Sequence, residues 1–122
     1  MTRTAPWSKT ILGQPYSKAN SRRIVEVAGK IRSIKSKSAL SYSQTFLMQC
    51  PILDPLFTDD LHIDIDIYYS NRKPDLDESL ILDLLQGRVY KNDRQIKSKY
   101  IRWHLDKENP RSVISIRLLE DQ

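Results

Sequence analysis

The chain has 122 residues, enough for one domain with one hydrophobic core, and a second domain is not expected. Hydrophobic residues make up 39% of it, without a long apolar run or an apolar segment after Met1. We therefore expect a soluble, cytoplasmic protein with neither a membrane span nor a signal peptide. The single cysteine, Cys50, excludes an intrachain disulfide and a four-thiolate zinc site, and we expect it to be a packing residue.

The net charge of +5 is distributed in blocks along the chain. Between Lys18 and Lys37, seven basic residues oppose Glu26 alone. Between Asp54 and Asp83, nine acidic residues oppose two basic ones, and after that segment nine basic residues oppose five acidic ones. An acidic centre with basic flanks suits a polyanion that is attracted to the protein and then meets a metal held by carboxylates. The alternative is an ordinary solvated surface.

The first half of the chain is predicted to contain one strand, a hairpin and a helix. We expect residues 1–9 to form a loose terminus before a short strand at residues 10–12. Residues 24–34 fit an amphipathic helix and a hairpin equally, and the glycine within residues 28–30 leads us to favour the hairpin. A structural helix is predicted over residues 36–50, because serines can cap its start and a proline follows its end.

Strands dominate the second half. Residues 61–69 alternate apolar and polar side chains and give the clearest strand signal. A helix is predicted over residues 78–86, with Gly87 as its C-terminal cap. Further strands are predicted at residues 88–90, 95–105 and 112–119, the last two joined by a turn at residues 106–110. This order predicts a single α+β domain with a mixed β-sheet and about two helices packed on one face.

Three aspartates of the acidic region are candidate metal ligands. Pro74 favours an extended approach to the following residues, in which Asp75 and Asp77 point the same way. Asp93 follows after one short helix, and the three carboxylates could converge on one divalent cation, Mg²⁺ or Mn²⁺. The alternative is that Asp75 and Asp77 merely cap the helix that follows them.

The other polar candidates fit structural roles better. Asp64 and Asp66 could join a metal site, but the wet face of a strand is commonly charged, and we favour solvent exposure for both. His62 and His104 lie in strand-like segments without metal-ligand spacing, so we expect them to be surface or packing residues. No serine nucleophile motif or glycine-rich phosphate loop is present, and no small-molecule cofactor is expected. Carboxylates can hold one or two divalent ions, and such metal sites can activate water to cleave a phosphodiester.

Several short motifs lie in a fixed order around these aspartates. Pro74-Asp75-Leu76-Asp77 is followed by a leucine-rich helix, Gly87, Val89-Tyr90 and Asp93-Arg94-Gln95-Ile96. This order resembles the core signature of the RusA family of Holliday junction resolvases. The likeness extends to Leu12-Gly13-Gln14-Pro15 with Ser17-Lys18, and to residues 106–111 before a final strand. It covers most of the chain, and the ordered combination is far more specific than any single motif.

The resemblance implies that residues 1–122 form a single RusA-like endonuclease domain. Members of the family are homodimeric, Mg²⁺-dependent endonucleases of DNA recombination and repair that bind four-way DNA junctions and nick two opposing strands symmetrically. By this resemblance Asp75, Asp77 and Asp93 are the catalytic residues, which hold the metal and activate water. A C2 dimer would supply two identical sites for the two cuts.

DNA binding in such a protein would rest on contacts to phosphates, without base reading. The basic residues that we expect to make these contacts are Lys18, Arg22, Arg23, Lys30, Lys35, Lys37, Lys73 and Lys91.

The chain departs from the family pattern near its second aspartate. Glu78 stands where the family has asparagine, Asn92 where it usually has aspartate, and Ile81 where it has a functionally important lysine. The segment between Asp77 and Asp83 is also about two residues short of the common pattern. The sequence does not decide whether Lys73, Lys91 or Arg94 supplies the missing positive charge. A non-catalytic or weakly active junction-binding module is therefore the alternative function.

Overall fold

The computed structural model describes residues 3–15, 22–27, 29–35 and 37–119. The elements in these ranges are β1 (Trp7–Leu12), β2 (Arg22–Val27), β3 (Lys30–Lys35), α1 (Lys37–Gln49), β4 (Leu61–Tyr69), α2 (Ser79–Leu85), the 3₁₀ turn η1 (Asp93–Gln95), β5 (Ile96–Leu105) and β6 (Arg111–Leu118). The predicted hairpin, both helices and the strands on either side of the final turn are thereby confirmed.

Four strands form one mixed sheet in the order β1-β6-β4-β5. β4 is parallel to β5 and antiparallel to β6, which in turn is antiparallel to β1. The parallel pair exists because the chain crosses from β4 to β5 through α2, so that both strands run in the same direction. The predicted α+β fold with a mixed sheet is confirmed.

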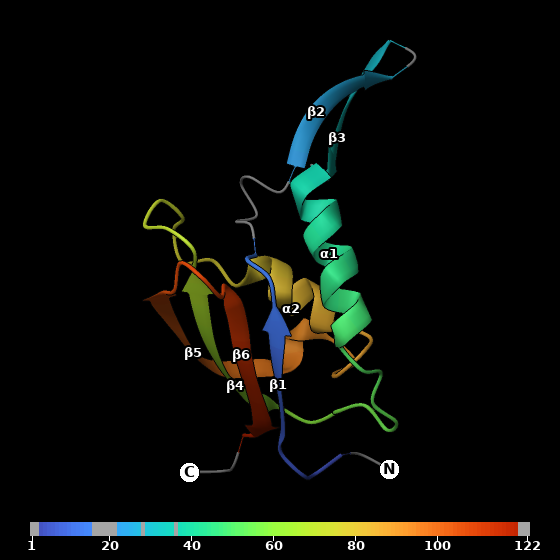
Figure 1. The fold of residues 1–122 in the computed structure, drawn as a ribbon. Coiled ribbons are helices and arrows are strands. Elements are labelled where there is room, and N and C mark those ends of the chain that lie inside the picture. The colour runs from blue at the N-terminus through green and yellow to red at the C-terminus, as the bar shows by residue number, and fades with distance from the viewer. Residues whose placement is uncertain (1–2, 16–21, 28, 36, 120–122) are drawn as a thin grey trace.

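The hydrophobic core lies between this sheet and the two helices. The residues of β4 alternate strictly between buried and partly exposed, and Ile63, Ile65 and Ile67 are fully buried. They share one cluster with Phe46 of α1 and Ile81 of α2, so both helices cover the same face. The opposite face of the sheet carries no helix of the described residues, and we call it the open face (Figure 1).

The β2–β3 hairpin stands apart from the sheet. Figure 1 shows it beyond the N-terminal end of α1, directed away from the four strands. Its register places Arg22 opposite Lys35 and Val27 opposite Lys30. Gly29 closes the turn with φ of 77°, a conformation that suits glycine because it has no Cβ.

Two predicted boundaries are wrong for identifiable reasons. β1 begins at Trp7, within the predicted loose terminus, because Trp7 pairs with Ile116 at the far end of β6. In place of the strand predicted at residues 88–90, the structure has a turn at residues 87–89, followed by Tyr90, which makes isolated β-bridges to Phe57 and Gln86. The Gly87 N–H donates to the Tyr90 carbonyl over 2.8 Å, and this bond closes the chain after α2. Val89 and Tyr90, whose residue types favour strands, are fully buried here, so they contribute to the core and not to a strand.

No helix within the described residues has the length and apolar character needed to cross a membrane.

The packing of β4 against both helices predicts a large effect of truncation at its centre. Replacing Ile65 with Ala should lower the free energy of unfolding by roughly 2–5 kcal/mol, because a buried side chain is lost and a cavity remains. Ile52→Ala is the matched control: Ile52 is 66% exposed, and its truncation should change stability by less than about 0.5 kcal/mol. Urea denaturation of both variants measures the difference, and equal losses would contradict this core.

Candidate active site

Residues 74–78, which we call the acidic loop, lie along the helix-covered side of β4 and β5. The indole nitrogen of Trp103 on β5 donates a hydrogen bond of 3.0 Å to the first carbonyl of the loop. The Tyr69 hydroxyl donates to the Asp75 carbonyl over 3.3 Å and accepts from the Asp77 N–H over 3.4 Å. One buried phenol at the end of β4 therefore contacts the backbone of two predicted metal ligands.

The register of β5 explains why this side of the sheet receives the loop. Lys99 lies opposite Ile63 of β4, so its side chain emerges on the same face as the buried isoleucines. Trp103, four residues further on, points the same way and stacks on Tyr69 with ring centroids 5.6 Å apart. The Lys99 ammonium forms an ion pair of 2.7 Å with Glu78, the last residue of the loop. The acidic loop is thus attached to β5 near both of its ends.

Neither loop aspartate is the N-cap residue of α2, which is Glu78 and makes no side-chain cap bond. Asp77 is half-buried, and its Oδ1 accepts the N–H of Ser79, the first residue of α2, over 2.9 Å. No corresponding bond links the exposed Asp75 to this turn within the described part of the chain. The bond to Ser79 also orients the Asp77 carboxylate, as hydrogen bonds do for carboxylates that bind metals.

Asp93 is the exposed first residue of η1, and a capping box fixes its position. The Asn92 side chain accepts the Arg94 N–H over 2.9 Å, and the Gln95 side chain accepts the Asn92 N–H over 2.7 Å. The Gln86 side-chain oxygen accepts a hydrogen bond of 2.8 Å from the Asp93 N–H. These bonds satisfy the backbone of η1, as a capping box does at a helix start, and leave the turn in a defined place beside α2.

Asp93 also lines a pocket of about 240 Å³ between α2 and the start of β5. The lining residues are Leu82, Asp93, Ile96, Lys97, Ser98 and Lys99. Because Lys99 also pairs with Glu78, the pocket adjoins the end of the acidic loop.

The structure brings the three predicted aspartates to one side of β5 but not into a closed ligand shell. Among the described residues, no three His, Cys, Asp or Glu side chains gather closely enough to hold a metal ion. The donor chemistry nevertheless fits Mg²⁺ or Mn²⁺, which prefer hard carboxylate oxygens. Asp75 and Asp93 are exposed, so water and a phosphate oxygen could complete an octahedral shell around an ion held there.

The carboxylates of the loop also act on the phenol beneath them. Burial raises the pKa of Tyr69, and the negative charges of Asp77, Glu78 and Asp75 raise it further. Tyr69 therefore remains a neutral hydroxyl at physiological pH and can keep both of its hydrogen bonds to the loop.

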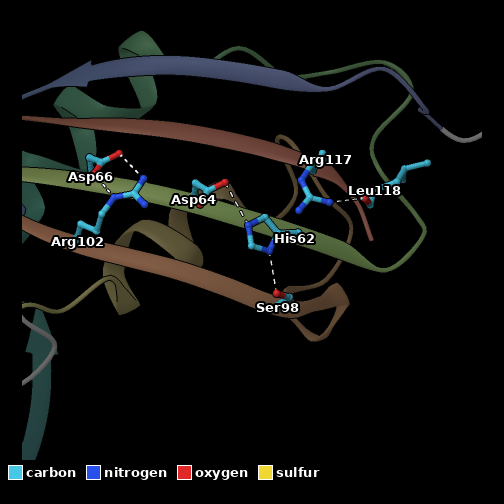
Figure 2. Close-up of polar contacts among 7 residues, drawn as sticks. All are labelled: His62, Asp64, Asp66, Ser98, Arg102, Arg117 and Leu118. Atoms are coloured by element: carbon cyan, nitrogen blue, oxygen red, sulfur yellow. Dashed lines mark hydrogen bonds and ion pairs between the residues drawn. The ribbon is translucent and has the colours of Figure 1, made fainter. Parts of the chain in front are cut away.

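Asp64 and Asp66 lie on the open face of β4, opposite the acidic loop (Figure 2). Asp66 Oδ2 accepts from the Arg102 guanidinium over 2.9 Å, and its Oδ1 lies 2.7 Å from His104 Nε2. Asp64 lies 3.2 Å from His62 Nε2. The hydrogen bond from Arg102 lowers the pKa of Asp66 to about 2. On the open face Asp66 thus forms an ion pair with Arg102 and Asp64 a hydrogen bond with His62, whereas the sequence predicted only that both aspartates face solvent.

The predicted DNA-binding residues lie in two regions. Lys73 and Lys91 are exposed in the segments before and after α2, and Lys37 is exposed at the start of α1. Lys18 lies outside the described residues. The strands of the hairpin contain Arg22, Arg23, Lys30 and Lys35.

A polar groove of about 390 Å³ lies between these two regions. Gly13 and Gln14 form one part of it, and residues of α1 form the other: Lys37, Ser38, Ser41, Tyr42 and Thr45. The Gln14 side chain accepts two hydrogen bonds of 2.7 Å, from the N–H and the hydroxyl of Ser70. Since Ser70 begins the segment that leads to the acidic loop, Gln14 connects the groove to this segment.

Comparison with models of protein families gives a match to endodeoxyribonuclease RusA over residues 13–117. The matched region contains the groove, the acidic loop, η1 and the whole of β5. The chain belongs to the RusA endodeoxyribonuclease family. Membership implies an endonuclease of the Holliday junction resolvase type, which acts on branched DNA. No curated protein matches the chain.

Packing explains why Ile81 departs from the RusA pattern. The side chain is fully buried in the cluster between α2 and the sheet, where a charged lysine would be desolvated without a partner. The three alternative cations considered from the sequence, Lys73, Lys91 and Arg94, are all exposed.

Sequence reasoning missed three side chains that hold the acidic loop: Tyr69, Trp103 and Lys99. Tyr69 was predicted only as the last residue of a strand. The sequence does contain a signal for Lys99. It lies two residues before Ile101 and four before Trp103, so all three side chains point to the inward face of β5. A lysine on an otherwise apolar strand face indicates a charged partner nearby.

The ion pair on the open face predicts a pH-dependent contribution to stability. The pKa of Asp66 is lowered from 3.8 to about 2, so its contribution is present above about pH 4 and is lost as the pH falls towards 2. Asp66→Asn should lower the free energy of unfolding by about 1 kcal/mol at pH 7, and this deficit should shrink near pH 2. Urea denaturation at both pH values measures it, with the exposed Asp59→Asn as control. A deficit independent of pH would contradict the assignment.

Proposed function

We propose that this member of the RusA family is a divalent-metal-dependent endonuclease of DNA recombination and repair, active in the cytoplasm. It resolves four-way DNA junctions by paired symmetric nicks, with Mg²⁺ as its ion and Mn²⁺ as a substitute. The observation that carries the proposal is the attachment of the acidic loop to β5 beside the pocket of Asp93. The carboxylates of the loop and of the pocket are the kind of oxygen donors that metal ions use in phosphodiester cleavage.

The proposed ligands are Asp75, Asp77 and Asp93. Two of them follow one another on a loop whose backbone contacts a single phenol, so their relative position is fixed by Tyr69. The third stands on a separately capped turn. An ion held by these residues would lower the pKa of a water molecule and offset charge on the phosphate.

The charge distribution supports DNA as the substrate. Four carboxylates at the site, those of Asp75, Asp77, Glu78 and Asp93, would repel a phosphodiester in the absence of cations. Lys37 lines the groove, the basic hairpin precedes α1 in the chain, and Lys73 and Lys91 flank α2. DNA phosphates would thus be held by basic residues on the approach to the site.

A homodimer is part of the proposal. A four-way junction has two-fold symmetry, and a C2 pair presents two copies of the acidic loop to two equivalent strands. Sedimentation of the purified protein tests this part directly, because one chain has a mass of 14.3 kDa and a dimer has twice that mass.

The substitution Asp77→Asn tests the proposed site. Asparagine retains an oxygen for the Ser79 N–H and should preserve the loop, but it removes the charge that binds the ion. Mg²⁺-dependent nicking of a synthetic four-way junction should fall by about 10²-fold or more. Junction binding, measured by gel shift with Ca²⁺ in place of Mg²⁺, should be retained.

The control for this experiment is Asp60→Asn, an equal change of charge at an exposed residue just before β4. It should nick the junction as the unmodified protein does. Undiminished nicking by Asp77→Asn would exclude the assigned ligands.

The alternative is a junction-binding module without nuclease activity. It is favoured by the buried Ile81 and by the lack of a closed group of three metal-ligating side chains among the described residues. The two functions separate in one assay with labelled four-way junction and linear duplex. The module predicts salt-sensitive junction binding without cleavage in Mg²⁺ or Mn²⁺, whereas the nuclease predicts cleavage in both.

A further inference from the structure

Lys99 occupies a position on β5 at which the strand otherwise presents apolar side chains. Its neighbours on the same face are Ile101 and Trp103, and its partner in the parallel register is the buried Ile63. The Lys99 side chain is nevertheless 52% exposed, because β5 is an edge strand and the ammonium reaches the rim of the core. Lysine commonly buries its aliphatic stem in this way while its charge stays in water.

The ammonium of Lys99 lies between the two parts of the proposed site. On one side it forms the 2.7 Å ion pair with Glu78, the residue that follows Asp77. On the other it lines the pocket that also contains Asp93. Among the described residues, Lys99 is the one cation that does both. The exposed Lys73, Lys91 and Arg94 line neither this pocket nor the inner face of β5.

In the free protein, which contains no phosphate, the Lys99 ammonium is paired with Glu78. An ammonium beside several carboxylates takes the nearest one as its partner. The Lys99 side chain is 52% exposed and the Glu78 side chain 15% exposed, so the ammonium can be reached from solvent while the pair is formed. An incoming phosphodiester offers oxygen atoms that the same ammonium can bind.

We infer that Lys99 is a catalytic residue, whose ammonium leaves Glu78 and binds the scissile phosphate beside Asp77 and Asp93. The inference rests on the proposed nuclease function. In the reaction a water oxygen forms a bond to phosphorus and this water gives up a proton to solvent, one ester P–O bond breaks, and the leaving oxygen takes up a proton from solvent. Negative charge accumulates on the phosphate oxygens in the transition state, and a positioned ammonium stabilises it there.

The test compares Lys99→Gln, Lys99→Arg and Lys107→Gln. Lys107 lies exposed in the turn between β5 and β6, so its substitution makes the same change of charge outside the site. Single-turnover nicking of the four-way junction should fall by about 10²-fold in Lys99→Gln. Lys99→Arg should recover at least about tenfold of this loss, because it retains a cation that binds phosphate. Lys107→Gln should nick at the unmodified rate.

Binding without a divalent ion gives a second readout. In EDTA, the slope of log affinity against log salt concentration should decrease by about 1 in Lys99→Gln, because one phosphate contact is lost. A lysine that merely ties down the acidic loop would leave this slope unchanged. In that case Glu78→Gln, which breaks the same ion pair, would also impair nicking as much as Lys99→Gln. We expect a clearly smaller loss for Glu78→Gln.

The outcomes separate this inference from the function on which it rests. Nicking at the unmodified rate by Lys99→Gln, alongside an inactive Asp77→Asn, would overturn the role of Lys99 and leave the nuclease intact. If the unmodified protein does not nick at all, the nuclease proposal is wrong. The salt slope in EDTA then still decides whether Lys99 contacts phosphate, and an unchanged slope overturns it. Thermal unfolding of each variant checks that the fold is retained.

Discussion

The attachment of the acidic loop to β4 and β5 is the constraint on which the candidate site depends. A short loop rich in carboxylates would otherwise extend into solvent, because its charges repel one another. Here the indole of Trp103 and the phenol of Tyr69 hold its backbone, and Lys99 holds its last side chain. The three groups come from inward positions of two parallel strands, so the hydrophobic core itself sets the position of the acidic residues.

The crossover from β4 to β5 explains how residues distant in sequence reach the same side of the sheet. After β4 the chain folds back over the buried face as the acidic loop and α2, and η1 then turns it into β5. Because α2 covers the strands between these segments, the loop at its start and Asp93 after its end both border β5. A helix of seven residues spans about 10 Å, so the crossover is short.

The sequence predicted the architecture well because its signals are local. The alternation in residues 61–69, the proline after α1 and the glycine after α2 each determine one element or boundary. The turn at residues 87–89 was not predicted, because Val89 and Tyr90 favour strands when considered alone and are here buried against the core. For the site, the types and order of the proposed ligands are readable from the motif. The contacts of Tyr69, Trp103 and Lys99 are not, because they depend on the parallel register of β4 and β5.

The exchange of a lysine for Ile81 and the presence of Lys99 have one physical basis. Position 81 lies in the core, where an isoleucine is favoured and an ammonium would lose its hydration. A cation needed near the carboxylates must then come from another element with access to the same pocket. The edge strand offers such a place, because its inward side chains border solvent and need not be fully apolar. Charge at an active site is thus constrained by where an ammonium can remain hydrated as well as by the positions of the ligands.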